Sequence, residues 1–146
     1  MPVKKQLNGS ADEVESAFYD ALSRADLEGL MALWAEDEEI VCIHPGAPRL
    51  IGHAAIRASW EAIFERGSVH IRPVQLHATQ NMLSSVHSVV EEVDSGSDGS
   101  PDMQDIHILA TNVYVKTPRG WRIATHHASI AAGKPPPEIF KASVLH

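Results

Sequence analysis

The spacing of apolar residues changes once along this chain of 146 residues, and that change limits the folds it can adopt. Up to Gly67, apolar residues recur every three or four positions, as they do in amphipathic helices. From Ser68 onward they alternate with polar residues, as they do in half-buried strands. Helices followed by long antiparallel strands predict an α+β domain, with the helices packed across one face of the sheet.

Local signals place three helices in the first half of the chain. Ser10, with a glutamate three residues later, has the pattern of a capping box and predicts a helix over about 10–25. Asp26 is able to cap a second, shorter helix, whose apolar stripe extends to Trp34. Gly52 opens a third helix, which ends where the apolar spacing changes.

The remaining regular segments predict a sheet. Strands are expected at 39–44, 49–51, 68–79, 82–94, 105–117 and 120–131. Three N-terminal helices packed on a strongly curved, mainly antiparallel sheet form a cone-shaped α+β barrel, and its open end is the natural place for a small-molecule pocket. We expect one domain over 1–146, with its core at about 10–131 and a proline-rich tail at 133–146 that docks through its apolar end.

Composition argues against several classes of partner. The 12 Lys and Arg residues are scattered and the formal net charge is -7, so binding to nucleic acid or to an anionic membrane surface is not expected. The sequence has no apolar leader and no apolar run long enough to span a bilayer, which favours a cytoplasmic protein. Cys42 lies in an apolar run and is expected to behave as a small buried hydrophobe.

Three segments, in this order and spacing, resemble the nuclear transport factor 2-like superfamily and, within it, the SnoaL-like and ketosteroid-isomerase-like proteins. They are 26-DLEGLMALWAEDEEIVCIHPG-46, 52-GHAAIR-57 and 120-GWRIATHHAS-129. The resemblance implies the cone-shaped fold over about residues 10–131. It does not imply one function, because this superfamily includes isomerases, cyclases, dehydratases and assembly modules on the same frame.

His44 is the first candidate catalytic residue. It follows an apolar strand and precedes Pro45. In the isomerases that the chain resembles, an aspartate before a proline at about this place moves a proton next to a carbonyl, which implies that His44 is a general base if a two-residue insertion is allowed. The alternative is a half-buried histidine bonded to a backbone group. The tyrosine of those isomerases that stabilises an oxyanion corresponds here to Phe18, so ketosteroid isomerase activity itself is not expected.

Two adjacent histidines on the last predicted strand are the next candidates. In an unbulged strand, His126 and His127 point to opposite faces. Counting by twos places Trp121, His127 and Ser129 on one face, which we expect to line the cone. His127 is then a second catalytic candidate and Ser129 a substrate-binding residue. The alternative is that both satisfy buried backbone groups.

Other residues complete the predicted substrate-binding set. Asn112 lies in the middle of a strand, where its amide needs a hydrogen-bonding partner. Trp34 and Trp60 lie on apolar helix faces, where they act either as core residues or as a platform for a ligand. Tyr19 and Trp121 are also predicted to bind the substrate. No helical His-x-x-x-His pair or Cys-His spacing occurs, so neither a metal nor another cofactor is expected. The alternative is a metal site formed by His44 and His127 from different strands.

Together these features predict a small homodimer that binds a hydrophobic, carbonyl-bearing small molecule in an apolar pocket. Its chemistry would be of the isomerase, cyclase or dehydratase type, with a histidine as the general base. The alternative is a ligand-binding or oligomerisation module without catalytic activity.

Overall fold

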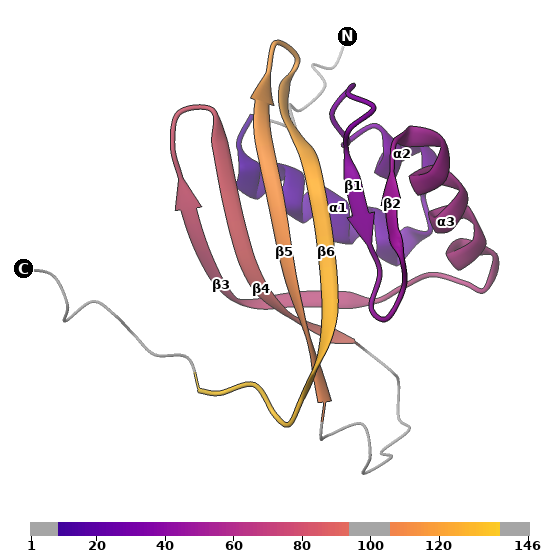
Figure 1. Cartoon of the computed structure of the whole chain (residues 1–146), viewed down its shortest axis with the longest axis vertical. Coiled ribbons are helices and arrows are strands. Elements are labelled where there is room, and N and C mark those ends of the chain that lie inside the picture. The colour runs from indigo at the N-terminus through magenta and orange to yellow at the C-terminus, as the bar shows by residue number, and fades with distance from the viewer. Residues whose placement is uncertain (1–8, 94–105, 138–146) are drawn as a thin grey trace, which may run out of the picture.

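Helices and a curved sheet form two layers in the computed structural model, which describes residues 9–93 and 106–137 (Figure 1). The elements in chain order are α1 (Ala11–Arg24), α2 (Leu27–Met31), β1 (Val41–Ile43), β2 (Arg49–Ile51), α3 (His53–Glu65), β3 (Ile71–Gln80), β4 (Ser84–Val93), β5 (Ile106–Thr117) and β6 (Gly120–Ala132). The predicted linker at 94–104 and the apolar end of the tail lie outside the described residues.

The strands form one six-stranded sheet in the order β2-β1-β6-β5-β4-β3. All neighbouring strands are antiparallel except β1 and β6, which are parallel. Figure 1 shows α1 crossing behind the curved sheet, with α2 and α3 beside β1 and β2. The predicted fold class, helices packed on a curved and mainly antiparallel sheet, is therefore confirmed.

Side-chain caps fix where the first two helices begin. The hydroxyl of Ser10 accepts a hydrogen bond from the backbone N–H of Glu13, and Asp26 accepts one from the N–H of Gly29. The second helix is shorter than its apolar stripe predicted. It ends at Met31 because the next residues pair with the sheet: Leu33 and Ala35 exchange backbone hydrogen bonds with Ile123 of β6.

The main hydrophobic core lies between the helices and the sheet. It includes Trp34, Trp60 and Trp121, which are 1%, 4% and 6% exposed. Cys42 is also buried and belongs to this core, as its apolar run predicted. No helix within residues 9–93 and 106–137 has the length and apolar character needed to cross a bilayer.

A β-bulge in β6 decides which of its side chains face the helices. Tyr114 pairs with Ile123, but the preceding residue of β5 pairs with Thr125, so Ala124 is an extra residue on β6. Beyond Ala124 the alternation is shifted by one, and His126 rather than His127 lies on the concave, helix-covered face.

Candidate functional site

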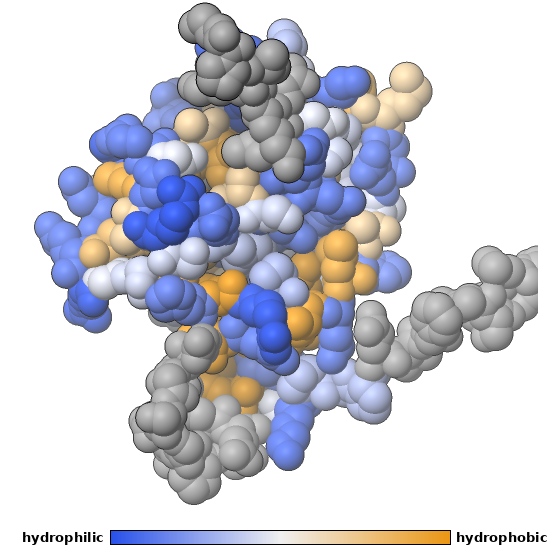
Figure 2. Space-filling model, turned by 180° about the vertical axis from the view of Figure 1, so that it is seen from behind, coloured by the Kyte–Doolittle hydropathy of each residue, from blue (hydrophilic) through white to orange (hydrophobic). Residues whose placement is uncertain are grey.

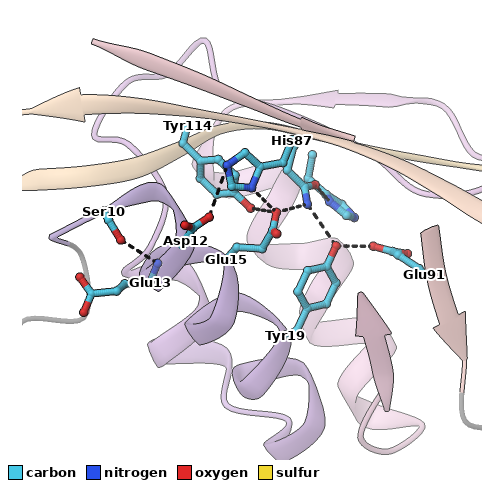
Figure 3. Close-up of polar contacts among 10 residues, drawn as sticks. Ser10, Asp12, Glu13, Glu15, Tyr19, His87, Glu91 and Tyr114 are labelled. Atoms are coloured by element: carbon cyan, nitrogen blue, oxygen red, sulfur yellow. Dashed lines mark hydrogen bonds and ion pairs between the residues drawn. The ribbon is translucent and has the colours of Figure 1, made fainter. Parts of the chain in front are cut away.

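A cluster of buried polar side chains lies between α1 and the concave face of the sheet (Figure 3). Two members come from α1 and five from β4, β5 and β6, and each is at most 6% exposed. They are Glu15, Tyr19, His87, Glu91, Asn112, Tyr114 and His126. Buried polar groups are costly unless they are hydrogen-bonded, so the partners of this cluster define what it can do.

One oxygen of Glu15 is the centre of the cluster. Its Oε2 accepts hydrogen bonds from His87 Nδ1 at 3.0 Å, Asn112 Nδ2 at 3.1 Å and the Tyr114 hydroxyl at 2.6 Å (Figure 3). The other ring nitrogen of His87 lies 3.8 Å from a carboxylate oxygen of Asp12, whose side chain is 78% exposed. The three donors compensate the carboxylate for its removal from water.

The hydrogen bonds around Asn112 run in one direction. Its Nδ2 also donates to the Tyr19 hydroxyl at 3.1 Å, so its Oδ1 is the atom that accepts from His126 Nδ1, at 2.6 Å. The Tyr19 hydroxyl in turn donates to Glu91 Oε2 at 2.7 Å. A directed chain thus runs from His126 through Asn112 and Tyr19 to Glu91, and it leaves the lone pair of His126 on Nε2.

Burial shifts the acid–base properties of these groups. It lowers the pKa of His126 to about 3, with smaller contributions from His44 and His127, so the imidazole is neutral at neutral pH. Burial also raises the pKa of Glu91, helped by the charge of Glu15 and opposed by the hydrogen bond from Tyr19. Since burial raises the pKa of Tyr19 as well, its hydroxyl keeps its proton at neutral pH.

His44 lies at the end of β1, half-buried, on the other side of an aromatic wall. Its ring is 4.7 Å from that of Trp60, which is 6.2 Å from the ring of His126. Its Nε2 lies 3.0 Å from the hydroxyl of Ser59, which donates to the Ile56 carbonyl and therefore accepts from His44. Burial lowers the pKa of His44, so it too is neutral at neutral pH.

The predicted placement of His127 and Ser129 is wrong. Both side chains are exposed on the convex face, because the bulge at Ala124 shifts the alternation. The structure instead brings His126 to the concave face, in the neighbourhood of His44. The centre of the His126 ring lies 4.9 Å from that of the Phe18 ring.

The other predicted residues lie on or behind the concave face. Tyr19 and Asn112 are part of the buried polar cluster, and Phe18 and Tyr19 are both buried in α1. The three tryptophans belong to the hydrophobic core, where Trp60 also forms the wall beside His44. Their roles toward a ligand stay predictions.

Sequence reasoning missed Glu15, His87, Glu91 and Tyr114. The signal for Glu15 is its position, since it precedes Phe18, Tyr19 and Leu22 by three, four and seven residues and so lies on the buried stripe of α1. On β4, strict alternation places His87 and Glu91 on one face with buried neighbours. A charged or titratable residue in a buried stripe is a candidate for function.

The strand register arranges the concave face in rows across β4, β5 and β6. The polar row is His87, Asn112 and His126. The small row, one step along, is Val89, Ala110 and Ala128, and each of these residues is at most 2% exposed. The outer row is Glu91, Ile108 and Ile130. Tyr19 therefore reaches across the small row, from Asn112 in the polar row to Glu91 in the outer row.

The concave face becomes apolar and accessible toward its outer end. Ile130 is 56% exposed, and Val93 and Ile106, beyond the outer row, are 47% and 39% exposed. Figure 2, from the side of α1, shows hydrophobic residues at the surface in the lower half of the view, between hydrophilic side chains. The face thus changes from a fixed polar cluster to an apolar surface, with Glu91 at the boundary.

Other features of the described residues lie elsewhere. One surface hollow of about 420 Å³ lies at the end of α3, lined by residues of 62–69. Another, of about 440 Å³, lies at the β3–β4 edge and is lined by His70, Ile71, Arg72, Glu92 and Val93. Among residues 9–93 and 106–137, no three His, Cys, Asp or Glu side chains are grouped so as to hold a metal ion.

Comparison with known proteins places this fold in a family. The model of the SnoaL-like domain matches residues 12–133. A solved structure from Thiobacillus denitrificans, described as a candidate calcium/calmodulin-dependent protein kinase type II association domain, is 33% identical. That match covers 87% of this chain and 99% of the other, with a TM-score of 0.74. No curated protein matches the chain.

Two further solved structures extend the comparison. A candidate dehydratase of the NTF2-like family from Streptomyces avermitilis is 27% identical over 81% of this chain and 91% of that one, with a TM-score of 0.69. A protein with a cystatin-like fold from Caulobacter vibrioides is 17% identical over 82% and 86% of the two chains, also with a TM-score of 0.69, and shows the fold alone. The chain belongs to the SnoaL-like domain family, within the NTF2-like superfamily.

Proposed function

We propose that the chain binds a small, mostly apolar molecule against the concave face of its sheet, and that the Tyr19–Glu91 pair exchanges a proton with it. The observation that carries this proposal is the position of the pair. Both side chains are buried and joined by a hydrogen bond of 2.7 Å, at the boundary between the polar cluster and the apolar outer end. A ligand on the apolar surface would meet these two groups first.

The chemistry of the pair suits a reaction in which a proton moves beside a carbonyl or hydroxyl group. Burial raises the pKa of Glu91 above its ordinary value, which makes its carboxylate a stronger base toward a ligand proton. The Tyr19 hydroxyl keeps its proton and is able to donate a hydrogen bond to an oxygen that gains negative charge. Isomerisation and dehydration both need these roles, and the likeness to a candidate dehydratase supports this class.

His44 and His126 are the other candidate bases. Both are neutral at neutral pH, and each has one nitrogen with its proton directed to a partner, Ser59 or Asn112. His44 is half-buried, so it is the more accessible of the two, and its predicted role as a base remains part of the proposal.

Exchange of hydrogen for deuterium next to a carbonyl tests the proposal directly. In D₂O, the wild-type protein is expected to accelerate exchange at the α-carbons of at least one small cyclic ketone, such as cyclohexanone, cyclooctanone or 2-decalone, followed by NMR. Tyr19→Phe and Glu91→Gln are each expected to lower the acceleration by about a hundredfold, a typical contribution of one positioned acid–base group.

The matched control is Glu92→Gln, since Glu92 is the next residue, is exposed, and forms an ion pair with Arg72 on the opposite face. It should leave the acceleration unchanged. If no ketone exchanges faster with the wild-type protein, the proton-transfer role is wrong. If only His44→Ala slows exchange, the base is His44 and not the Tyr19–Glu91 pair.

A second candidate function is self-assembly through the convex face. Val86 and Leu109 are 39% and 40% exposed there, and the chain is 33% identical to a candidate association domain. We expect a dimer or larger species in sedimentation velocity, and Leu109→Asp should convert it to monomer by burying an unpaired charge. Leu83→Asp at the 66% exposed β3–β4 turn is the control and should change nothing. A wild-type monomer at tens of micromolar would rule out this candidate.

A further inference from the structure

Among the described residues, the concave face has buried acids but no buried lysine or arginine. Its buried polar and charged side chains include Glu15 and Glu91, with Asp12 at the rim beside His87. Every described lysine and arginine is exposed or half-buried. Of the described residues, those buried around Glu15 and Glu91 therefore offer a ligand two carboxyl groups and no guanidinium or ammonium group.

Two acceptor atoms on buried side chains of this cluster have no hydrogen-bond donor among residues 9–93 and 106–137. His126 donates through Nδ1 to Asn112, which leaves the lone pair on its Nε2 without a donor. Glu91 accepts from Tyr19 at Oε2, and nothing donates to its other oxygen. Both side chains are 4% exposed, so little of either residue reaches the surface. Acceptors that lack a protein donor favour a ligand that supplies donors.

We propose that this site selects a molecule with a basic amine on an apolar skeleton over its alcohol and carboxylate counterparts. The inference rests on the proposed function, because it concerns the same site. An ammonium group has three donors and no acceptor, and its positive charge is attracted to Glu91, whose carboxyl group has a single protein donor, Tyr19. Its apolar skeleton would lie over the outer row, against Ile108 and Ile130.

Alcohols and carboxylates with the same skeleton fit the site less well. An alcohol supplies one donor and no charge, so it satisfies one acceptor and adds no positive charge beside Glu91. A carboxylate is an acceptor only and would bring a third negative charge to Glu15 and Glu91 in a site shielded from water. The expected order of affinity is therefore amine, then alcohol, then carboxylate.

Three probes with one skeleton test this order at pH 7.5. They are 2-cyclohexylethylamine, 2-cyclohexylethanol and cyclohexylacetic acid, each titrated into isotopically labelled full-length protein and followed through the backbone amide signals of Ala110 and Ala128. We expect the amine to bind about tenfold more tightly than the alcohol, in line with the difference between charged and neutral hydrogen bonds, and the carboxylate to bind most weakly.

A pair of variants locates the selectivity. Glu91→Gln should bring the amine and alcohol affinities within about threefold of each other while the alcohol still binds, because it removes the charge and keeps the shape. Glu92→Gln, on the exposed opposite face, should preserve the tenfold preference.

The outcomes separate the two proposals. If none of the probes shifts the Ala110 and Ala128 signals, binding at the concave face itself fails. If the alcohol shifts them and the amine binds no more tightly, or the carboxylate binds as tightly as the alcohol, then binding stands and the amine preference is wrong. A preference that survives Glu91→Gln also overturns it.

Discussion

Lowering the pH from 7 to 4.5 is expected to destabilise the wild-type protein more than a His126→Gln variant, by about 2–3 kcal/mol of unfolding free energy. The pKa of His126 falls from an ordinary 6.5 to about 3 in the folded protein, because burial disfavours the charged ring. Between these two values the unfolded chain binds a proton that the folded protein does not. The free energy of unfolding therefore falls as the pH falls, by roughly 1.4 kcal/mol per pH unit for this group.

The neighbouring residue supplies the control. His127→Gln removes an exposed histidine and keeps the buried one, so the wild-type loss of stability on acidification should persist. The free energy of unfolding of all three proteins is measured by urea unfolding at pH 7 and at pH 4.5. Equal losses in wild type and His126→Gln would contradict the buried position of this ring. For each protein, the test uses only the change in unfolding free energy between the two pH values. It is therefore independent of any change in stability that the substitution causes at pH 7.

Glu15→Gln is expected to destabilise the protein by about 3 kcal/mol at neutral pH, the scale of a broken buried charge network. One oxygen of Glu15 accepts from His87, Asn112 and Tyr114. A carboxamide keeps one acceptor without the charge and points an NH₂ group into a cluster already rich in donors. For a chain of this length the melting temperature should fall by about 6–12 °C, as measured by calorimetry.

Glu13→Gln makes the same chemical change two residues earlier in α1. Glu13 is half-exposed, and its contact with Ser10 is made by its backbone N–H, so the loss should stay within about 0.5 kcal/mol. A similarly small loss for Glu15→Gln would show that the cluster does not depend on its carboxylate. Combined with Tyr114→Phe, Glu15→Gln should cost less than the sum of the single changes, because both remove the same hydrogen bond.

Local sequence signals predicted the elements of the fold well, since their causes are local. The caps at Ser10 and Asp26 form within three residues, and the long strands lie within a few residues of their expected bounds. The end of α2 was not predicted, because it depends on backbone bonds between Leu33, Ala35 and a strand nearly ninety residues later.

The candidate site was harder to predict because its contacts are distant in sequence. Glu15 meets its partners on β4 and β5 across separations of 72 to 99 residues. Asn112 was recognised as an amide in need of a partner, but nothing local identifies Glu15, Tyr19 and His126 as those partners. The bulge in β6 decides on which face of the sheet His126 lies, and the alternation of apolar and polar residues does not reveal that bulge.

The extra residue at Ala124 means that the interior of the cone depends on register as well as on residue type. In an unbulged β6, Thr125 would lie opposite Asn112 and His127 opposite Ala110, so the same sequence would present different groups to a ligand. Related proteins with this fold are thus able to present different side chains to the interior by gaining or losing a single bulge. Diversification of chemistry then needs no substitution at any interior position.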